Sequence, residues 1–216
     1  MRIYLIYIFL SLSFISMTFD AGIKGTVVCF GDSITHGAKG DGHSWVYLLS
    51  KEHKEVNFIN AGRNGRKTSD KKELLPVLKK YPQADYYLIF LGVNDLKNGN
   101  DSMVNQCVKN MDWMINKIKD TNKKAKIVIL APTDINLNTM SQLNVNKKYN
   151  ANTRSSLIKL EMKYKELAKD NNLGFISLLK TVSPPNYVDG LHPDEKGQQQ
   201  IADAVWNGLE KLYTKK

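Results

Sequence analysis

Residues 26–35 read TVVCFGDSIT, a short apolar run that ends in a glycine followed by polar side chains. Similar apolar runs recur along the chain, at residues 56–59, 86–91, 127–130 and 175–178. Each is short and almost continuously apolar, which is typical of strands that are covered on both faces of a parallel sheet. We therefore predict five parallel strands.

Segments with helical periodicity separate these runs. Apolar side chains recur at spacings of three and four over residues 104–118, 157–168 and 201–212, and residues 44–55 are expected to form a surface helix. Right-handed crossovers between parallel strands place helices on both faces of a sheet. The alternation therefore predicts an α/β fold, a three-layer α/β/α sandwich.

Length and composition limit the class of protein. A chain of 216 residues without a linker rich in proline or glycine corresponds to one sizeable core. With 42% hydrophobic and 24% charged residues, general disorder is excluded. The two cysteines, Cys29 and Cys107, are too few for a disulfide-rich scaffold or a four-cysteine zinc ribbon. Both lie in apolar stretches, so we expect two buried free thiols.

The chain is basic, with 31 lysines and arginines against 21 acidic residues and a formal net charge of +10. Such an excess is typical of proteins that bind nucleic acids or membrane surfaces. Here most of it is lysine spread over the predicted outer faces of helices, without the arginines and interleaved aromatic rings that read nucleic acid. We interpret it as solvated helix surface and predict no nucleic-acid partner. The only arginines are Arg2, Arg63, Arg66 and Arg154.

The amino terminus has a different composition. After Arg2, residues 3–19 carry no charge and are strongly apolar. This stretch is slightly long for the core of a signal peptide and short for a membrane span. We predict that residues 1–22 are a signal peptide or a retained anchor, the only route to membrane association. Residues 23–216 are expected to form a single domain outside the cytoplasm, secreted or periplasmic.

Polar clusters follow several of the predicted strands. Ligands of open parallel sheets bind outside the carboxyl ends of the strands. We therefore expect these clusters to share one edge of the sheet and to form the functional site. They are residues 31–35, 60–65, 92–95 and 189–193.

Ser33 is the candidate nucleophile, because a serine on a tight turn between strand and helix projects its hydroxyl above the sheet. The hydroxyl needs a base. His192 is the best candidate among four histidines, since Asp189 lies three residues earlier and can orient the ring. His36 has no carboxylate so placed and is expected to be a rim or structural residue. Asp32 is expected to brace the turn.

A serine hydroxyl that attacks a carbonyl group creates a tetrahedral oxyanion, which needs hydrogen-bond donors. We predict three: the backbone N–H of Ser33 at a helix start, the backbone N–H of Gly65, which no side chain shields, and the side-chain amide of Asn94. Each feature alone is common in proteins. Together, in order on one predicted edge, they indicate a serine hydrolase.

These residues resemble the SGNH, or GDSL, family of serine hydrolases. The resemblance is specific at residues 31–35, 92–95 and 189–192 and extends over about residues 26–210. The block that supplies an oxyanion glycine is looser, so Gly65 is preferred and Gly62 is the alternative.

The resemblance implies a flavodoxin-like sheet of five parallel strands in the order 2-1-3-4-5, and neither a metal nor an organic cofactor. It also implies the catalytic residues Ser33, Asp189 and His192. Thr35 stands where the Gly-x-Ser-x-Gly turn of the α/β-hydrolases has its last glycine, which disfavours that other fold.

The predicted function is hydrolysis of carboxylic esters through an acyl-enzyme, on a small-molecule or glycan substrate with short acyl groups such as acetyl. One alternative is a lysophospholipase or thioesterase acting on longer chains, and another is a non-catalytic module that binds glycans or lipids. The short-acyl prediction depends on polar residues expected at the rim of the site, which are Lys39, Asp41, Arg63, Arg66 and Asn98.

Residues 132–150 are rich in asparagine and long for a loop in a compact domain. Three roles are open for this segment: a cap over the site, a disordered loop, or a contact between subunits. The sequence does not predict the oligomeric state.

Overall fold

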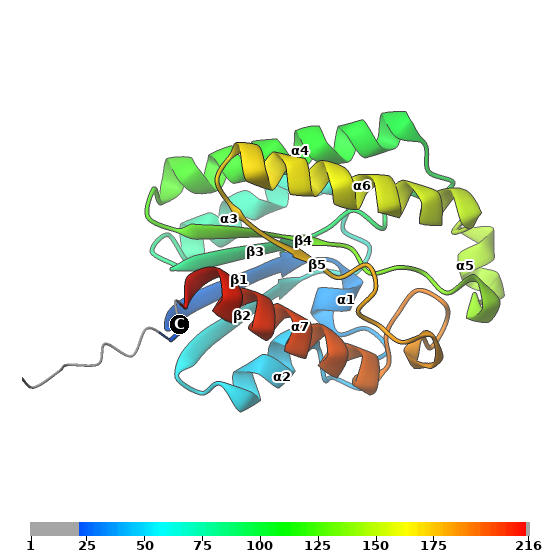
Figure 1. Ribbon diagram of the computed structural model, residues 1–216, viewed down its shortest axis with the longest axis horizontal. Coiled ribbons are helices and arrows are strands. Elements are labelled where there is room, and N and C mark those ends of the chain that lie inside the picture. The colour runs from blue at the N-terminus through cyan, green and yellow to red at the C-terminus, as the bar shows by residue number, and fades with distance from the viewer. Residues whose placement is uncertain (1–21, 215–216) are drawn as a thin grey trace, which may run out of the picture.

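The computed structural model describes residues 22–214, which form a central sheet with helices on both sides (Figure 1). Apart from Gly22, the segment predicted as a signal peptide or anchor lies outside the described residues. Within residues 22–214 no helix combines the length and the apolar character needed to cross a membrane.

All strands of the sheet run parallel, in the order β2-β1-β3-β4-β5, which confirms the predicted order. Each strand begins within one residue of its predicted start. Only β2 extends clearly beyond its predicted end, because its pairing with β1 continues as far as Gly31 and Gly62. The strands are β1 Gly25–Gly31, β2 Val56–Gly62, β3 Tyr86–Phe90, β4 Lys126–Ala131 and β5 Gly174–Ser177.

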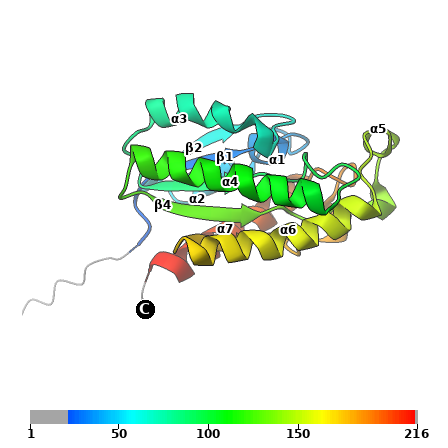
Figure 2. The same cartoon turned by 90° about the horizontal axis from the view of Figure 1, so that it is seen from above.

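Helices and short 3₁₀ helices connect the strands. They are α1 Ser33–His36, α2 Trp45–Glu52, η1 Thr68–Glu73, α3 Leu74–Lys80, α4 Asp101–Thr121, η2 Leu137–Thr139, α5 Gln142–Asn146, α6 Ala151–Asp170, η3 Pro184–Asn186 and α7 Glu195–Tyr213. Successive side chains of a strand point to opposite faces of the sheet. In β1, Val28 and Phe30 pack with α3, α4 and α6, and Val27 and Cys29 pack with α2 and α7. The three-layer sandwich is therefore confirmed, and Figure 2 shows it from above.

Apolar periodicity did not locate two parts of the fold. The connection from β2 to β3 contains η1 and α3, whose periodicity is weak because only Leu74 and Leu78 of α3 are buried. Pro76 lies in the first turn of α3, where its missing N–H costs no helical hydrogen bond. Residues 132–150 contain η2 and α5, so this segment is structured.

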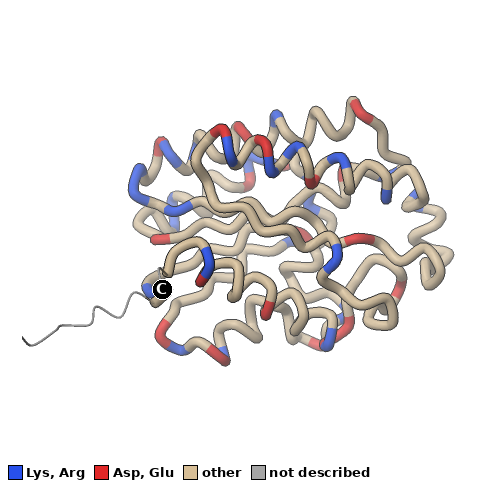
Figure 3. The backbone as a smooth tube through the Cα atoms, viewed as in Figure 1, with Lys and Arg blue, Asp and Glu red and all other residues tan. Residues whose placement is uncertain are grey.

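The charge is distributed as predicted. Lysines alternate with acidic residues along α4 and α6 in Figure 3, and some of them pair within one helix, as Lys117 does with Asp120 and Lys163 with Glu166. Cys29 and Cys107 are buried free thiols, as expected.

Candidate active site

The turn after β1 places Ser33 at the carboxyl edge of the sheet. Asp32 caps α1, and its Oδ1 accepts a hydrogen bond from the Ile34 N–H at 2.9 Å, which confirms that Asp32 braces the turn. Gly31 makes the turn possible, because a Cβ at that position would lie 2.1 Å from the Thr35 hydroxyl. Ser33 is 7% exposed and is one of the residues that line the pocket described below.

A chain of hydrogen bonds joins Ser33 to His192 and Asp189. The Ser33 Oγ lies 3.0 Å from the His192 Nε2, although 159 residues separate them in sequence. On the other side of the ring, the His192 Nδ1 lies 2.9 Å from the Asp189 Oδ2. The structure thus brings together the three residues for which catalysis was predicted.

The environment of Asp189 keeps its carboxylate ionised. Burial acts to raise its pKa, but hydrogen bonds from the His192 ring and backbone N–H, together with the Leu191 N–H, outweigh burial and hold the pKa well below its usual value. An ionised Asp189 fixes the imidazole tautomer that leaves Nε2 free to accept a proton.

A small pocket of about 240 Å³ opens beside Ser33 and His192. Ligand pockets usually have volumes of ~300 to 1,000 Å³, so this one fits only a small group. Polar groups and apolar surface both line it, from Ser33, Ala38, Asn64, Gly65, Asn94, Lys97, Asn144, Lys147, Tyr149, Leu191 and His192.

The structure distinguishes Gly65 from Gly62. Gly65 lines the pocket with a φ of +74°, a left-handed conformation that favours glycine. Gly62 ends β2, and its N–H is already bound to the Asn60 Oδ1 at 2.9 Å. The backbone of Gly65 is therefore the better placed of the two to donate to a bound group.

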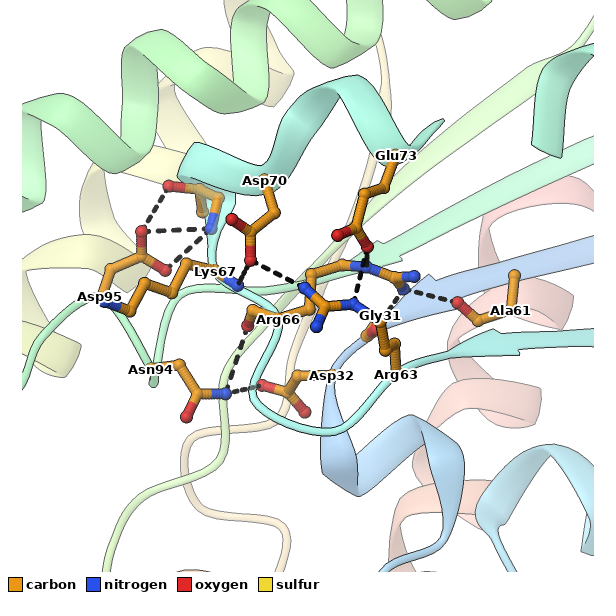
Figure 4. A network of polar contacts seen from close by, with 11 residues as sticks. Gly31, Asp32, Ala61, Arg63, Arg66, Lys67, Asp70, Glu73, Asn94 and Asp95 are labelled. Atoms are coloured by element: carbon orange, nitrogen blue, oxygen red, sulfur yellow. Dashed lines mark hydrogen bonds and ion pairs between the residues drawn. The ribbon is translucent and has the colours of Figure 1, made fainter. Parts of the chain in front are cut away.

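Asn94 lies beside Ser33 with its amide held at both ends. Its Nδ2 donates to the Asp32 Oδ2 and to the Arg66 carbonyl, each at 3.2 Å (Figure 4). Its Oδ1 accepts a hydrogen bond from the Tyr149 hydroxyl at 2.7 Å. These contacts fix which end of the amide carries the donors.

Arg66 lies beneath the site and not at its rim, which corrects one expectation. Its side chain is buried, and its guanidinium donates to the carbonyls of Gly31 and Ala61 and to the Glu73 carboxylate, as Figure 4 shows. It also lies 4.1 Å from the centre of the Phe30 ring. The sequence prediction failed here because a buried arginine has the same local pattern as an exposed one.

Asp32 is a buried carboxyl at the centre of the site, 1% exposed. Burial raises its pKa to about 6, although the Ile34 N–H bond and the nearby charges of His192 and Arg66 oppose this, while Asp95 adds to it. The Asp32 side chain holds both the turn and Asn94. Its burial in the charged form lowers the stability of the fold.

This cost predicts a pH effect on stability. The folded protein keeps Asp32 protonated up to about pH 6, whereas the unfolded chain releases the proton near pH 3.9. As pH rises through this window, the wild type should lose up to about 3 kcal/mol of unfolding free energy relative to Asp32→Asn. Chemical denaturation at pH 4 and pH 7 measures this, with Asp203→Asn, at an exposed position of α7, as the matched control. The prediction is wrong if the difference in unfolding free energy between the wild type and Asp32→Asn changes with pH no more than the difference between the wild type and Asp203→Asn.

The other histidines lie outside the hydrogen-bond chain. His36 is exposed at the end of α1, in agreement with a rim position, while His43 stacks on Tyr47 and His53 on Trp206. Among residues 22–214, no cluster of His, Cys, Asp and Glu side chains is arranged to hold a metal ion.

Tyr149, Lys97 and Lys147 line the pocket but were not singled out from the sequence. Tyr149 and Lys147 belong to residues 132–150, so this segment borders the site and is not a disordered loop. No sequence signal marks Tyr149, because its contact with Asn94 joins positions 55 residues apart.

Solved structures share this fold. A carbohydrate acetylesterase family member from Sinorhizobium meliloti is 21% identical, with a TM-score of 0.74 over 88% of this chain and 99% of that one. The aryl esterase of M. smegmatis is 19% identical, with a TM-score of 0.74 over 87% and 99%. A putative arylesterase from Agrobacterium tumefaciens is 24% identical, with a TM-score of 0.69 over 88% and 100%. No sequence among curated proteins matches the chain significantly.

A parallel sheet in the order β2-β1-β3-β4-β5, with a serine, a histidine and a carboxylate together at its carboxyl edge, is the arrangement expected of an SGNH-type hydrolase of carboxylic esters. The GDSL-like lipase/acylhydrolase family model matches residues 29–200, which is most of the chain. The chain therefore belongs to this family.

Proposed function

We propose that the chain is a serine esterase that works through an acyl-enzyme. The observation that carries this proposal is the 3.0 Å contact between the Ser33 Oγ and the His192 Nε2, with Asp189 on the far side of the ring. Ser33 attacks the ester carbonyl carbon while His192 takes its proton. His192 returns that proton to the leaving alcohol as the carbon–oxygen bond breaks. Water, deprotonated by His192, then releases the acyl group and restores Ser33.

The backbone N–H groups of Ser33 and Gly65 and the Asn94 amide stabilise the oxyanion in this proposal. Both bonds that the Asn94 Nδ2 makes are long, at 3.2 Å, so the oxyanion can share one of these N–H groups as a second acceptor while the amide stays in place. Donors placed before the reaction gain most of their effect in the transition state, where the charge develops.

Short acyl groups on carbohydrate are the substrate class that we favour. The pocket holds only about 240 Å³, and Asn64, Asn144 and Lys147 place polar groups in its wall that can bind sugar hydroxyls. The structural relatives described as a carbohydrate acetylesterase and as arylesterases are consistent with this choice.

One observation favours the alternative of longer acyl chains. Leu143 and Val145 flank Asn144 on α5 and are 62% and 48% exposed. An alkyl chain that leaves the pocket past either of these side chains would cover exposed apolar surface.

A series of p-nitrophenyl esters separates these substrates. We expect kcat/KM to be highest for the acetate and to fall by at least about ten-fold by the octanoate, because the pocket is too small for the longer chain. A maximum at octanoate or beyond would instead support the long-chain alternative, and Leu143→Asn should then lower that maximum. Absence of turnover on every ester, together with binding to acetylated glycans, would overturn the proposed esterase in favour of a binding module.

A further inference from the structure

The segment of residues 141–149, here called the bridging segment, contacts the site at both of its ends. Near its start, the Ser141 N–H and the Asn144 side-chain amide both donate to the Asp189 carbonyl, each at 3.1 Å. At its other end lies Tyr149, whose N–H donates to the Asn144 carbonyl at 3.1 Å. The position of Tyr149 therefore depends on the turn that carries Asp189.

Tyr149 holds the oxygen end of the Asn94 amide. The Tyr149 side chain is 3% exposed, and its hydroxyl donates to the Asn94 Oδ1 at 2.7 Å. The nitrogen end of the same amide donates to Asp32 and to the Arg66 carbonyl at 3.2 Å. The contact with Tyr149 is thus the shortest of the three that position Asn94.

The Tyr149 hydroxyl is a stable donor. Burial, and then the negative charges of Asp32, Asp95 and Asp189, raise its pKa far above the usual value, so it keeps its proton at any working pH. The Lys97 ammonium lies 5.3 Å from the centre of the Tyr149 ring and further restricts its position.

We propose that Tyr149 is a positioning residue for ester hydrolysis, which acts through Asn94 and rests on the function proposed above. A hydrogen bond accepted at Oδ1 draws electron density from the amide and makes its N–H groups stronger donors. The same bond fixes the plane of the amide, so that Nδ2 is aimed before the oxyanion forms. The bridging segment thereby couples the placement of the oxyanion donor to the placement of Asp189.

Kinetics of Tyr149→Phe on p-nitrophenyl acetate test this inference. Since the negative charge on this oxygen is absent from bound substrate and develops in the transition states that flank the tetrahedral intermediate, we expect kcat to fall about five- to ten-fold with KM unchanged. Asn94→Ala should lose about 100- to 1,000-fold in kcat. In the Asn94→Ala background, Tyr149→Phe should have no further effect, because Tyr149 then has no amide to position.

The matched control is Tyr87→Phe. Tyr87 is also buried, and its hydroxyl donates to the Tyr81 carbonyl near the amino end of the sheet, away from the pocket. This control should keep the wild-type kcat. Rates are expressed per site labelled to completion by a fluorophosphonate, so that partial unfolding does not count as lost activity.

The outcomes separate the inference from the proposed function. Equal hydrolysis by the wild type and Ser33→Ala would overturn both. An inactive Ser33→Ala with a fully active Tyr149→Phe would overturn the inference alone. So would an equal fall in kcat for Tyr149→Phe in the wild-type and Asn94→Ala backgrounds, because that pattern belongs to a general structural role.

Discussion

Ser33→Ala is expected to lower kcat for p-nitrophenyl acetate by a factor on the order of 10⁶. The hydroxyl oxygen is the atom that forms the acyl bond in the proposed mechanism, and within residues 22–214 it is the side-chain atom hydrogen-bonded to the His192 Nε2, at 3.0 Å. The residual rate should come from the oxyanion donors and from binding, which remain in the variant. Steady-state kinetics on purified protein measure the loss.

Ser50→Ala is the matched control for this substitution. The Ser50 hydroxyl donates to the Tyr47 carbonyl in α2, so its removal should leave the rate unchanged. A fluorophosphonate should label Ser33 in the wild type and label nothing in Ser33→Ala. Full activity in Ser33→Ala would mean that Ser33 is not the nucleophile.

His192→Ala is expected to cost as much as Ser33→Ala, again a factor on the order of 10⁶, and the double variant should be no slower than either single variant. The two side chains act as one unit, because the hydroxyl is a weak nucleophile without the base. Asp189→Asn should lose less, about 10⁴-fold, since His192 and Ser33 remain but the tautomer is no longer fixed.

His36→Ala is the control for the histidine. His36 belongs to the same short helix as Ser33 but is exposed and lies outside the hydrogen-bond chain. We expect it to keep the wild-type rate. A loss at His36 equal to the loss at His192, or multiplying losses in the Ser33/His192 double variant, would contradict the assignment of the base.

The strands could be predicted closely from the sequence because each contains a short apolar run, which is longest in β1, β3 and β4, where burial on both faces is almost complete. Each predicted strand start lies within one residue of the observed one. Prediction was weaker where few side chains are buried, as in α3, where only Leu74 and Leu78 are covered. In the five-residue α5, only Asn144 is buried, so no apolar periodicity marks this helix.

The site could be predicted in part. His192 and Asp189 are three residues apart on one turn, so their contact is local and can be read from the sequence. Arg66 was misplaced at the rim, because its burial depends on carbonyls of β1 and β2 that its own neighbours in sequence do not reveal.

By itself, the sequence determined where the five strands and the helices with strong apolar periodicity lie along the chain, and the clustering of Ser33, Asn94 and His192 at the carboxyl ends of strands. Apolar periodicity and the parallel arrangement are enough for that. Only the tertiary structure decided that Gly65 and not Gly62 faces the pocket, and that Tyr149 holds Asn94. These contacts depend on how distant segments pack against the edge of the sheet, and packing between distant segments leaves no periodic signal in the chain.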